Sequence, residues 1–428
     1  MRIRYIAHIV MEAQSPLKVG SNASDFLQDS PVQKDWNDLP MILGTSIAGI
    51  LRKSFGGGED EVFGKADGSK IIFSNALLLD ENGKVNEGLL FDRSDFLSIF
   101  DHLPIREHTA ITDKGVARDN SKFDEEVVYK GARFKFSIEM LDDKEAFEKI
   151  IDLLLDPAFR LGGGTTKGFG KFKILKIISQ SFDEEGYADY SNSLNDVLAD
   201  TLEPKETRSQ KYTNYTLKIS PDDFFMFGSG FGDSDADSTP VYEKVVDYPN
   251  AKLSDAQLLI PASSIKGALS HRTVFHYNND KAVRDTIESG NAKTGEENDA
   301  VKAVFGHKKE LAADGKTELG QKGKVLLSDC FKENRGNTKV FDHVSIDRFT
   351  GGAIDGALFQ EKTIAQKDVW EIEVLLEKGI DEIYVKAFEM ALDDICRGML
   401  PLGGMTTKGH GVFTGVCLKD GEVLDVER

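Results

Sequence analysis

Two aspartate-rich loops carry the side chains of this chain that could serve metal or proton chemistry. One runs from Gly20-Ser21 to Asp29-Ser30-Pro31-Val32, and the other from Gly228-Ser229 to Asp237-Ser238-Thr239-Pro240-Val241. A carboxylate near its ordinary pKa of ~3.9 is a poor base at neutral pH, so its natural task would be to hold a metal ion or a metal-bound water. Acids beside Ser-Pro are also common turn formers, and the residues alone favour that reading.

Two glycine-rich loops of nearly the same sequence form a second candidate site. The stretch Leu161-Gly162-Gly163-Gly164-Thr165-Thr166-Lys167-Gly168-Phe169-Gly170 returns as Leu402-Gly403-Gly404-Met405-Thr406-Thr407-Lys408-Gly409-His410-Gly411. Glycines let a backbone approach phosphate closely, and Lys167 and Lys408 stand where a cation would complete an anion site. Neither loop has P-loop spacing. A tight bend between a helix and a strand would need the same glycines, so both readings stay open, although the repetition favours binding.

Two predicted helices, 47–55 and 265–275, collect several cations close to hydroxyl residues. Thr45-Ser46 and Ser263-Ser264 precede them and are expected to cap their first turns. The free N–H groups of a helix amino terminus can bind phosphate, and nearby cations add charge. A solvated helix face is the usual alternative, but clustered cations are rare in this acidic chain. We expect nucleic-acid contacts from Ser46, Arg52, Lys53, Ser264, Lys266 and Arg272.

The motifs recur in the same order, so the chain contains one module twice. The helix motif 39–52 returns at 259–272, and Val62-Phe63-Gly64 returns as Val304-Phe305-Gly306 between the helix motif and the glycine loop. The distance between copies grows from 218 positions at Gly49 and Gly267 to 241 at Gly168 and Gly409. Module two therefore carries extra residues, which we place in a helical insertion near 278–300.

The order of elements within each module predicts the fold class. Each copy begins with an alternating strand, passes through a helix and a central arm to a second helix (144–155 and 386–399), and ends with the glycine loop and a strand. This order predicts an α+β fold of two ferredoxin-like (RRM-like) domains of the β-α-β-β-α-β plan. We place the first domain at 1–180, a solvated acidic linker with a short helix at 181–212, and the second domain at 213–428.

The central arms, placed at 106–130 and 346–367, differ in sequence. The second carries Arg348, Phe349 and Phe359, which suit stacking against bases. An offset of 241 sets the segment 105–111 against 346–352, and in that alignment the first arm lacks the Asp-Arg pair. An ordinary surface hairpin is the alternative for both arms.

Composition limits the class of protein. The 428 residues suffice for two or three domains, and 40% hydrophobic with 29% charged residues is ordinary for a soluble protein. No apolar run reaches the ~20 residues of a membrane span, and Met1-Arg2-Ile3-Arg4-Tyr5 is expected to begin a strand and not a signal peptide. Cys330, Cys396 and Cys417 lack metal-ligand spacing, which predicts free thiols in a cytoplasmic protein.

Charge and histidine content argue against some kinds of site. A net charge of −19 argues against a general nucleic-acid binder, although screening within ~10 Å leaves room for a local basic groove. The histidines show no metal-ligand spacing along the chain, and we assign none of them to catalysis.

Taken together, the repeated helix motif and glycine loop are similar to the RAMP superfamily of CRISPR-associated proteins, whose hallmark is the carboxy-terminal glycine loop. The stretch Val344-Ser345-Ile346-Asp347-Arg348-Phe349-Thr350-Gly351-Gly352-Ala353, with Gly356-Ala357-Leu358-Phe359 after it, resembles the central arm of Csm and Cmr backbone subunits of type III effectors. The resemblance covers nearly the whole chain, twice, and leaves out only the linker and the insertion. Three motifs in fixed order are far more specific than one glycine loop.

The resemblance implies a tandem backbone subunit of a type III CRISPR ribonucleoprotein. Such subunits stack along a guide RNA and insert their arms, called thumbs, between guide and target strands. It also implies metal-dependent cleavage of target RNA by an aspartate in the loop after the first strand. Asp29 falls on that position; Asp237 lies one residue further from its proline, with Asp233 and Asp235 as alternatives.

The implied cofactor is a divalent metal, expected to be Mg²⁺, with Asp29 as a candidate ligand. The implied partners are guide RNA, complementary target RNA and other effector subunits, with no membrane. Two alternatives remain: a scaffold whose acidic loops are inert, and a guide-processing endoribonuclease of the same superfamily. The second would favour a histidine-containing site and a hairpin substrate, and the sequence reveals neither.

Overall fold

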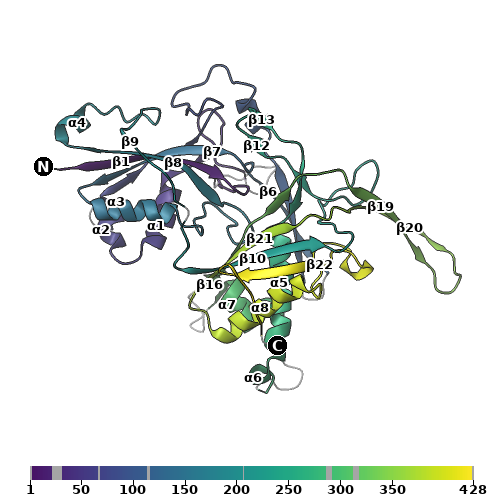
Figure 1. Cartoon of the computed structure of the whole chain (residues 1–428). Helices are drawn as coiled ribbons and strands as arrows, with labels where there is room; N and C mark the ends of the chain where they lie inside the picture. Colours follow the sequence, from purple (N-terminus) through teal and green to yellow (C-terminus); the bar gives the residue numbers. More distant parts are fainter. Residues whose placement is uncertain are drawn as a thin grey trace.

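The protein folds into two α+β modules that share a long junction (Figure 1). The computed structural model describes residues 2–21, 31–65, 68–112, 116–205, 207–285, 292–311 and 318–426. Asp29, the first candidate catalytic residue, lies outside these ranges. The α+β class is confirmed for both modules, and the ferredoxin-like assignment stays a prediction.

Module one is an antiparallel sheet with helices on one face. Strand β1 (Arg4–Ala13) pairs with β7 (Arg133–Leu141) on one side and β8 (Phe172–Phe182) on the other. Ala7, Ile9 and Met11 alternate along β1 and bury one face of the strand in the core, as the period of two requires. The remaining elements are β2 (Met41–Ile42), α1 (Gly44–Phe55), α2 (Glu59–Phe63), β3 (Ile71–Phe73), β4 (Ala76–Leu78), η1 (Leu97–Asp101) and α3 (Lys144–Leu154).

Module two repeats the central part of this plan. Strand β10 (Tyr212–Pro221) lies between β21 (Trp370–Glu377) and β22 (Phe413–Lys419), again antiparallel to both. Helices α5 (Ala262–Asn279) and α8 (Glu382–Cys396) pack on each other against this sheet (Figure 1). The shorter strands are β11 (Tyr242–Glu243), β12 (Val246–Asp247), β13 (Lys252–Leu253), β14 (Gln257–Ile260), β15 (Gly306–Leu311), β16 (Glu318–Lys322), β17 (Val325–Leu327), β18 (Cys330–Lys332) and β23 (Glu422–Val423).

The predicted insertion contains helix α6 (Lys281–Arg284), the turn η2 (Gly295–Glu297) and the start of α7 (Asp299–Phe305). That this segment is an insertion relative to module one stays a prediction. A further short helical turn, η3 (Thr406–Lys408), lies in the second glycine loop. Among the described residues, no helix is long and apolar enough to cross a membrane.

The acidic segment between the modules is mostly exposed, but Leu194 and Leu198 are buried, and the segment packs along module one instead of running free between the modules. Its predicted short helix is present as α4 (Glu184–Ala188), and β9 (Asp200–Leu202) extends the sheet beside β8. The Tyr190 hydroxyl lies 3.0 Å from Nε2 of the buried His8, and Leu198 packs on Ile6. Apolar and aromatic side chains spaced through the acidic segment explain the difference, because they bury the outer face of the sheet.

Helices α1 and α5 begin earlier than predicted, and the expected hydroxyl caps are wrong. Leu43 and Pro261 hold the cap positions, and neither makes a side-chain cap. Instead the first N–H group is bound by a side chain from a strand connection: Gly44 donates to Asn75 Oδ1 at 3.0 Å, and Ala262 donates to Asp329 Oδ1 at 2.8 Å. Such a distant cap satisfies a free helix N–H without any local signature.

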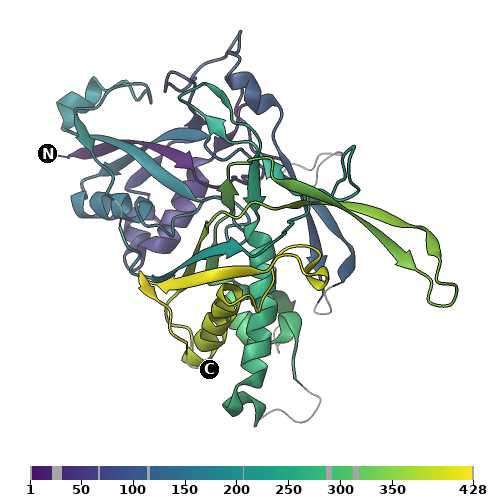
Figure 2. The ribbon, with the colours of Figure 1, turned by 45° about the vertical axis from the view of Figure 1, so that its right-hand side comes forward.

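Each module carries a two-stranded arm. The first arm is β5 (Ile105–Ile111) with β6 (Ala117–Glu126), and the second is β19 (Thr338–Ile346) with β20 (Ala353–Ile364). The second arm (green) projects from the body, and the first (blue) lies beside its base (Figure 2). The predicted start of the second arm at residue 346 is wrong, because 346 ends its first strand. Most side chains of β19 are exposed, so no buried face marks this strand in the sequence.

Candidate nucleic-acid interface

The end of the first glycine loop packs against module two. Gly168 has a φ of +112°, and a Cβ there would lie 2.5 Å from Asp329 Oδ1. Arg106, at the base of the first arm, donates from Nη1 to Asp329 Oδ2 at 2.6 Å and also pairs with Glu243. All three side chains are buried. A buried charged network therefore fixes module one's loop and arm against the start of α5.

Three lysines converge on this junction. Lys266 of α5 donates from Nζ to Thr166 Oγ1 in the first glycine loop, at 3.1 Å. Burial and the charges of Lys167 and Lys322 together lower the pKa of Lys266 to about 8. Cations that repel each other in a partly buried site favour an anion among them. The junction therefore brings cations of both modules together at a place that belongs to neither module alone.

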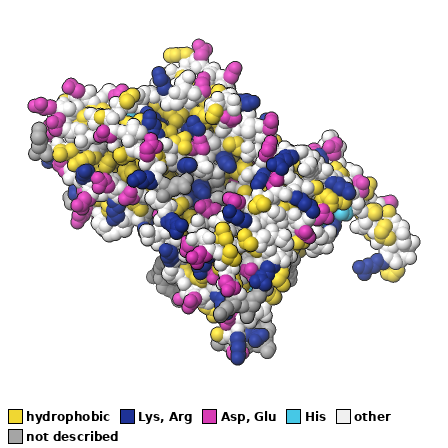
Figure 3. Space-filling model, viewed as in Figure 1, with side chains coloured by type: hydrophobic (Ala, Val, Ile, Leu, Met, Phe, Trp, Pro, Cys, Tyr) yellow, Lys and Arg dark blue, Asp and Glu magenta, His cyan; other side chains and the backbone are white. Residues whose placement is uncertain are grey.

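Further cations lie toward α1. Burial lowers the pKa of Lys322, and the exposed Lys53 and the buried Arg160 lower it further, whereas Glu377 raises it. Lys211 also donates to Ser54 O at 2.8 Å, so the end of α1 is tied to module two. Figure 3 shows Lys and Arg side chains along the band where the modules meet, interspersed with acidic ones.

Backbone packing explains several of the loop glycines. A Cβ at Gly162 would lie 2.2 Å from Lys18 O, and one at Gly403 would lie 2.3 Å from Met226 O. These matched contacts favour the tight-bend reading for those two positions. Gly409, which matches Gly168, has open space around it. The second glycine loop is thus free on the side where module two covers the first.

The bases of the two arms share an arrangement of aromatic residues that the alignment of the two arm sequences did not reveal. His108 pairs with Phe123 across the first arm, and His343 pairs with Phe359 across the second. In both arms the two rings stack, with centroids 5.2 and 4.9 Å apart. The glycine-loop lysine covers the phenylalanine, with Nζ of Lys167 5.1 Å and Nζ of Lys408 4.3 Å from the ring centroids.

The predicted alignment of the arms at an offset of 241 is therefore wrong. His343 follows His108 by 235 positions, and Phe359 follows Phe123 by 236. Each arm contains a register shift, between Thr109 and Ile111 in the first and between Val344 and Ile346 in the second. The glycine-loop offset consequently does not apply to the arms.

The second acidic loop lies between the two arms. Asp237 is exposed and accepts a hydrogen bond at Oδ2 from the Gln360 N–H of the second arm, at 2.8 Å. The alternative residues Asp233 and Asp235 both pair with Lys362, at 2.5 and 3.0 Å. On the other side, Phe231 lies under Lys122 of the first arm, with 5.4 Å from Nζ to the ring centroid.

The end of the first acidic loop is fixed in a comparable place. Val32, three residues after Asp29, donates its N–H to Glu126 Oε2 at 2.8 Å, at the base of the first arm. Gly20 and Val32 form a β-bridge, as do Gly228 and Pro240 in module two. Both acidic loops therefore leave and rejoin the body beside an arm base.

The other predicted contact residues fall into three groups. Arg52 pairs with Asp60, and Arg272 pairs with the buried Asp394, both at 2.5 Å, so these charges already have partners inside the protein. Ser46 is half-buried and Ser264 exposed in the first turns of their helices. Arg348 and Phe349 form the tip of the second arm, where Phe349 is 99% exposed.

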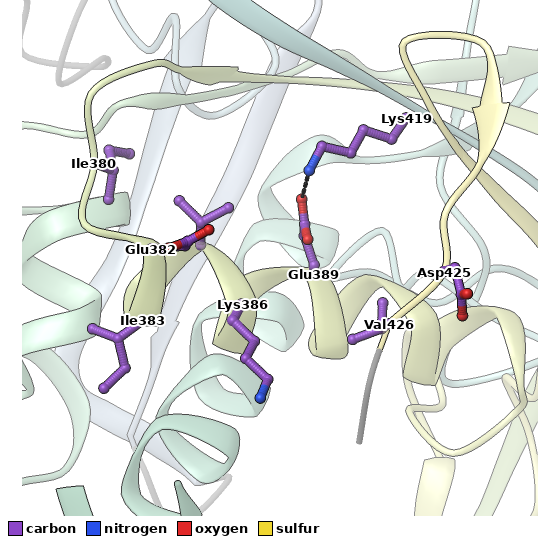
Figure 4. A pocket seen from close by; sticks show the side chains of 9 residues that line it. Ile380, Glu382, Ile383, Lys386, Glu389, Lys419, Asp425 and Val426 are labelled. Carbon is purple, nitrogen blue, oxygen red and sulfur yellow. Dashed lines mark ion pairs between the residues drawn. The ribbon is translucent and has the colours of Figure 1, made fainter. Parts of the chain in front are cut away.

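Within the part of the chain that the structure describes, a pocket lies apart from the arms and the glycine loops. One pocket lies between α8 and the carboxy-terminal segment, lined by Lys386, Glu389, Lys419 and Asp425 among others (Figure 4). Lys419 and Glu389 pair there at 2.7 Å. No arm or glycine-loop residue lines it. Over the described residues, no group of three His, Cys, Asp or Glu side chains is arranged to hold a metal.

These features define a class of protein: a tandem of two α+β modules, each with an arm and a glycine loop, that meet at a basic junction. The sequence profile of the RAMP superfamily matches the chain twice, over residues 10–173 and 228–414. The protein therefore belongs to the RAMP superfamily, and both modules carry the family signature.

Comparison with individual proteins adds little. No curated protein sequence matches the chain. One similar solved chain comes from a cryo-EM structure of the type III-B Cmr-β bound to cognate target RNA; it shares 18% identity and a TM-score of 0.31. The match covers 41% of this chain and 60% of that chain. A likeness of this size carries no argument about fold or activity.

Proposed function

We propose that this protein is a backbone subunit of a type III CRISPR ribonucleoprotein, binding guide RNA along both modules and cleaving complementary target RNA. The observation that carries the proposal is the lysine cluster at the junction, where Lys266 of one module meets Lys167 of the other. A ligand held there must cross from module to module. A polyphosphate chain such as RNA has the charge and the length to do so.

The two arms suit a duplex of guide and target. Asp347 Oδ1 accepts the N–H groups of Phe349 and Thr350, at 2.8 and 2.7 Å, and so shapes the turn at the tip of the second arm. The turn presents Arg348 and Phe349 to solvent, where an aromatic ring and a guanidinium can stack on bases. Specificity would come from base pairing, while the protein contacts phosphates, sugars and A-form shape.

Cleavage is assigned to Asp29 and Asp237. In-line attack by a ribose 2′-hydroxyl on the adjacent phosphorus requires a splayed nucleotide and a group that manages protons or charge. Asp237 suits a magnesium ion, because Mg²⁺ in such enzymes is held by one or two carboxylates with substrate phosphates and water. Its Oδ2 accepts the Gln360 N–H, which orients the carboxylate toward the second arm. A bound metal would supply Lewis-acid stabilisation of the developing charge.

A non-catalytic scaffold is the second candidate. The observation that favours it is the pairing of Asp233 and Asp235 with Lys362, since these pairs occupy the other carboxylates of the loop. In that case Asp237 would serve only as a turn residue that secures the arm.

The test of RNA binding is the salt dependence of affinity for a single-stranded RNA of guide length. Each phosphate contact with single-stranded RNA contributes about 0.7 to the slope of log K against log salt. Fluorescence anisotropy should show a lower slope for Lys266→Met than for wild type. The matched control is Lys281→Met, which removes an exposed lysine from α6. Equal slopes in all three proteins would contradict RNA binding at the junction.

A further inference from the structure

Each arm base contains a histidine paired with a glutamate. In the first arm, His108 Nε2 lies 3.3 Å from Glu125 Oε2. In the second arm, His343 Nε2 lies 3.0 Å from Glu361 Oε1. In both cases the histidine is on the first strand and the glutamate on the second, two residues after the stacked phenylalanine. The same arrangement thus occurs twice on arms whose sequences differ almost everywhere else.

The pairs are oriented alike. The glutamates are buried, and Glu361 has no exposed side-chain surface, whereas the side chains of His108 and His343 stay 13% and 24% exposed. The Nε2 atoms of both histidines are buried and lack a hydrogen bond of ordinary geometry, so each faces its glutamate as an ion-pair partner at 3.3 and 3.0 Å. A buried carboxylate facing one ring nitrogen favours a proton on that nitrogen and turns the other nitrogen away from the carboxylate. The nitrogen left for a ligand is therefore Nδ1 in each ring.

Charged neighbours surround both pairs. In module one, Lys18 pairs with Glu125 at 2.5 Å, and Lys167 lies beyond Phe123. Burial opposes ionisation of Glu125, but its interactions with His108 and Lys18 outweigh burial and lower the pKa of this carboxyl to about 2. In the same arm Lys122 pairs with Glu107 at 2.7 Å, and the Arg106 guanidinium lies over the Phe169 ring that meets His108 edge-on.

Module two has a second histidine at the pair. His410 Nε2 lies 3.2 Å from the same Glu361 oxygen as His343, and Lys408 lies over Phe359 on the far side of the stack. Lys339 covers the Phe341 ring, which packs on His410. Phe169 stands at the position of His410 in module one, so the part common to both modules is the single histidine with its glutamate.

The pairs lie beside the acidic loops that the proposed function assigns to cleavage. Asp237 bonds to the N–H of Gln360, the residue between Phe359 and Glu361. In module one, Val32 at the end of the first acidic loop bonds to Glu126, the residue after Glu125. Asp237 therefore lies beside the strand that faces His343, and Val32 lies beside the strand that faces His108.

We propose that His108 and His343 are the general acids of RNA cleavage, one for each module, with Glu125 and Glu361 as their positioning residues. This inference rests on the proposed function. The 2′-oxygen forms a bond to phosphorus as the P–O5′ bond breaks, and the imidazolium gives its proton to the departing 5′-oxygen. The 2′-hydroxyl proton leaves to water. The products are a 2′,3′-cyclic phosphate and a 5′-hydroxyl end, and the neutral histidine regains its proton from solvent.

The experiment compares single-turnover cleavage of labelled target RNA by assembled guide complexes. Their subunits are wild type, His108→Asn, His343→Asn and the control His102→Asn, which changes an exposed histidine outside the arms. General acid catalysis contributes typically ~10²–10⁴-fold, so each arm variant should lose that much rate at one defined cut and none at the other. Target affinity should be unchanged.

A substrate with sulfur in place of the 5′-bridging oxygen separates chemistry from structure. A thiolate leaves without protonation, so His108→Asn and His343→Asn should cut this substrate at the wild-type rate. Glu125→Gln should show a smaller defect with oxygen and none with sulfur. A defect that persists with sulfur, or variants that cut both substrates normally, would overturn the general-acid role. If wild type cuts neither substrate, the nuclease proposal itself fails, which is a separate outcome.

Discussion

Removing the guanidinium of Arg106 should destabilise the module junction strongly. Arg106 lies between Asp329 and Glu243, and all three side chains are buried. The variant Arg106→Met keeps most of the side-chain volume but leaves two carboxylates facing each other without a cation. Breaking a buried ion pair in this way costs about 3–5 kcal/mol. For modules of this size each kcal/mol shifts Tm by roughly 2–4 °C, so Tm should fall by about 6–20 °C.

Differential scanning calorimetry, with urea unfolding to obtain the free energy, measures this effect. Arg118→Met, which changes an exposed arginine in the first arm, is the matched control and should leave Tm unchanged. The triple variant Arg106→Met, Asp329→Asn, Glu243→Gln removes the stranded charges and should recover much of the loss. A loss below ~1 kcal/mol for Arg106→Met would refute the buried network as the link between modules.

The defect should also depend on pH. Burial raises the pKa of Asp329 even with Arg106 present, and without the arginine it should rise further. A carboxyl with a raised folded-state pKa binds a proton more tightly in the folded protein, so lowering the pH stabilises the variant relative to its unfolded state. The difference between wild type and Arg106→Met should therefore shrink between pH 8 and pH 5. A difference that grows on acidification would contradict this reasoning.

The pKa of Lys266 is lowered to about 8 by burial and by the charges of Lys167 and Lys322. Because bound phosphate favours the charged lysine, phosphate binding should be accompanied by proton uptake near pH 8.5. Titration calorimetry in buffers of different ionisation enthalpy should detect this uptake for wild type and not for Lys266→Met. The pKa of Glu125 is lowered to about 2, so its ionised form stabilises the folded protein fully above pH ~4.5. This stabilisation disappears as the pH falls toward 2. The acid unfolding curves of wild type and Glu125→Gln should therefore converge near pH 2. Phe349→Ala should change the free energy of unfolding by no more than ~0.5 kcal/mol, because the ring is exposed. It should weaken target binding by about 1–3 kcal/mol in a competition assay. Equal losses of folding stability and of binding free energy would contradict a stacking role for the tip of the second arm.

Local and repeated signals predicted much of this molecule. The apolar positions of α3, Phe147, Ile150, Ile151 and Leu154, are buried at the predicted helical spacing. The glycine loops are bends between a helix and a strand, as one of the two readings required. These features depend on residues close together in the chain, where period and turn chemistry suffice.

The sequence alone could not predict the features that depend on residues far apart in the chain. The caps of α1 and α5 come from Asn75 and Asp329, 31 and 67 positions from the N–H groups they bind. The histidine–glutamate pairs depend on the register of the arms, which shifts by bulges that sequence comparison cannot detect. The pattern that could have revealed the pairs is a histidine on the first strand of each arm and a Phe-x-Glu sequence on the second. In both arms the histidine faces the phenylalanine of that sequence.

The most direct test of the central claim is a cleavage map of labelled complementary RNA, cut by the assembled guide complex in magnesium. Wild type is compared with Asp29→Ala, Asp237→Ala and the double variant, with target binding measured in parallel. Each single variant should lose one defined cut, the double variant should lose both, and all four proteins should bind target equally. A double variant that cuts like wild type would show that this subunit is a scaffold and that the nuclease lies elsewhere in the complex.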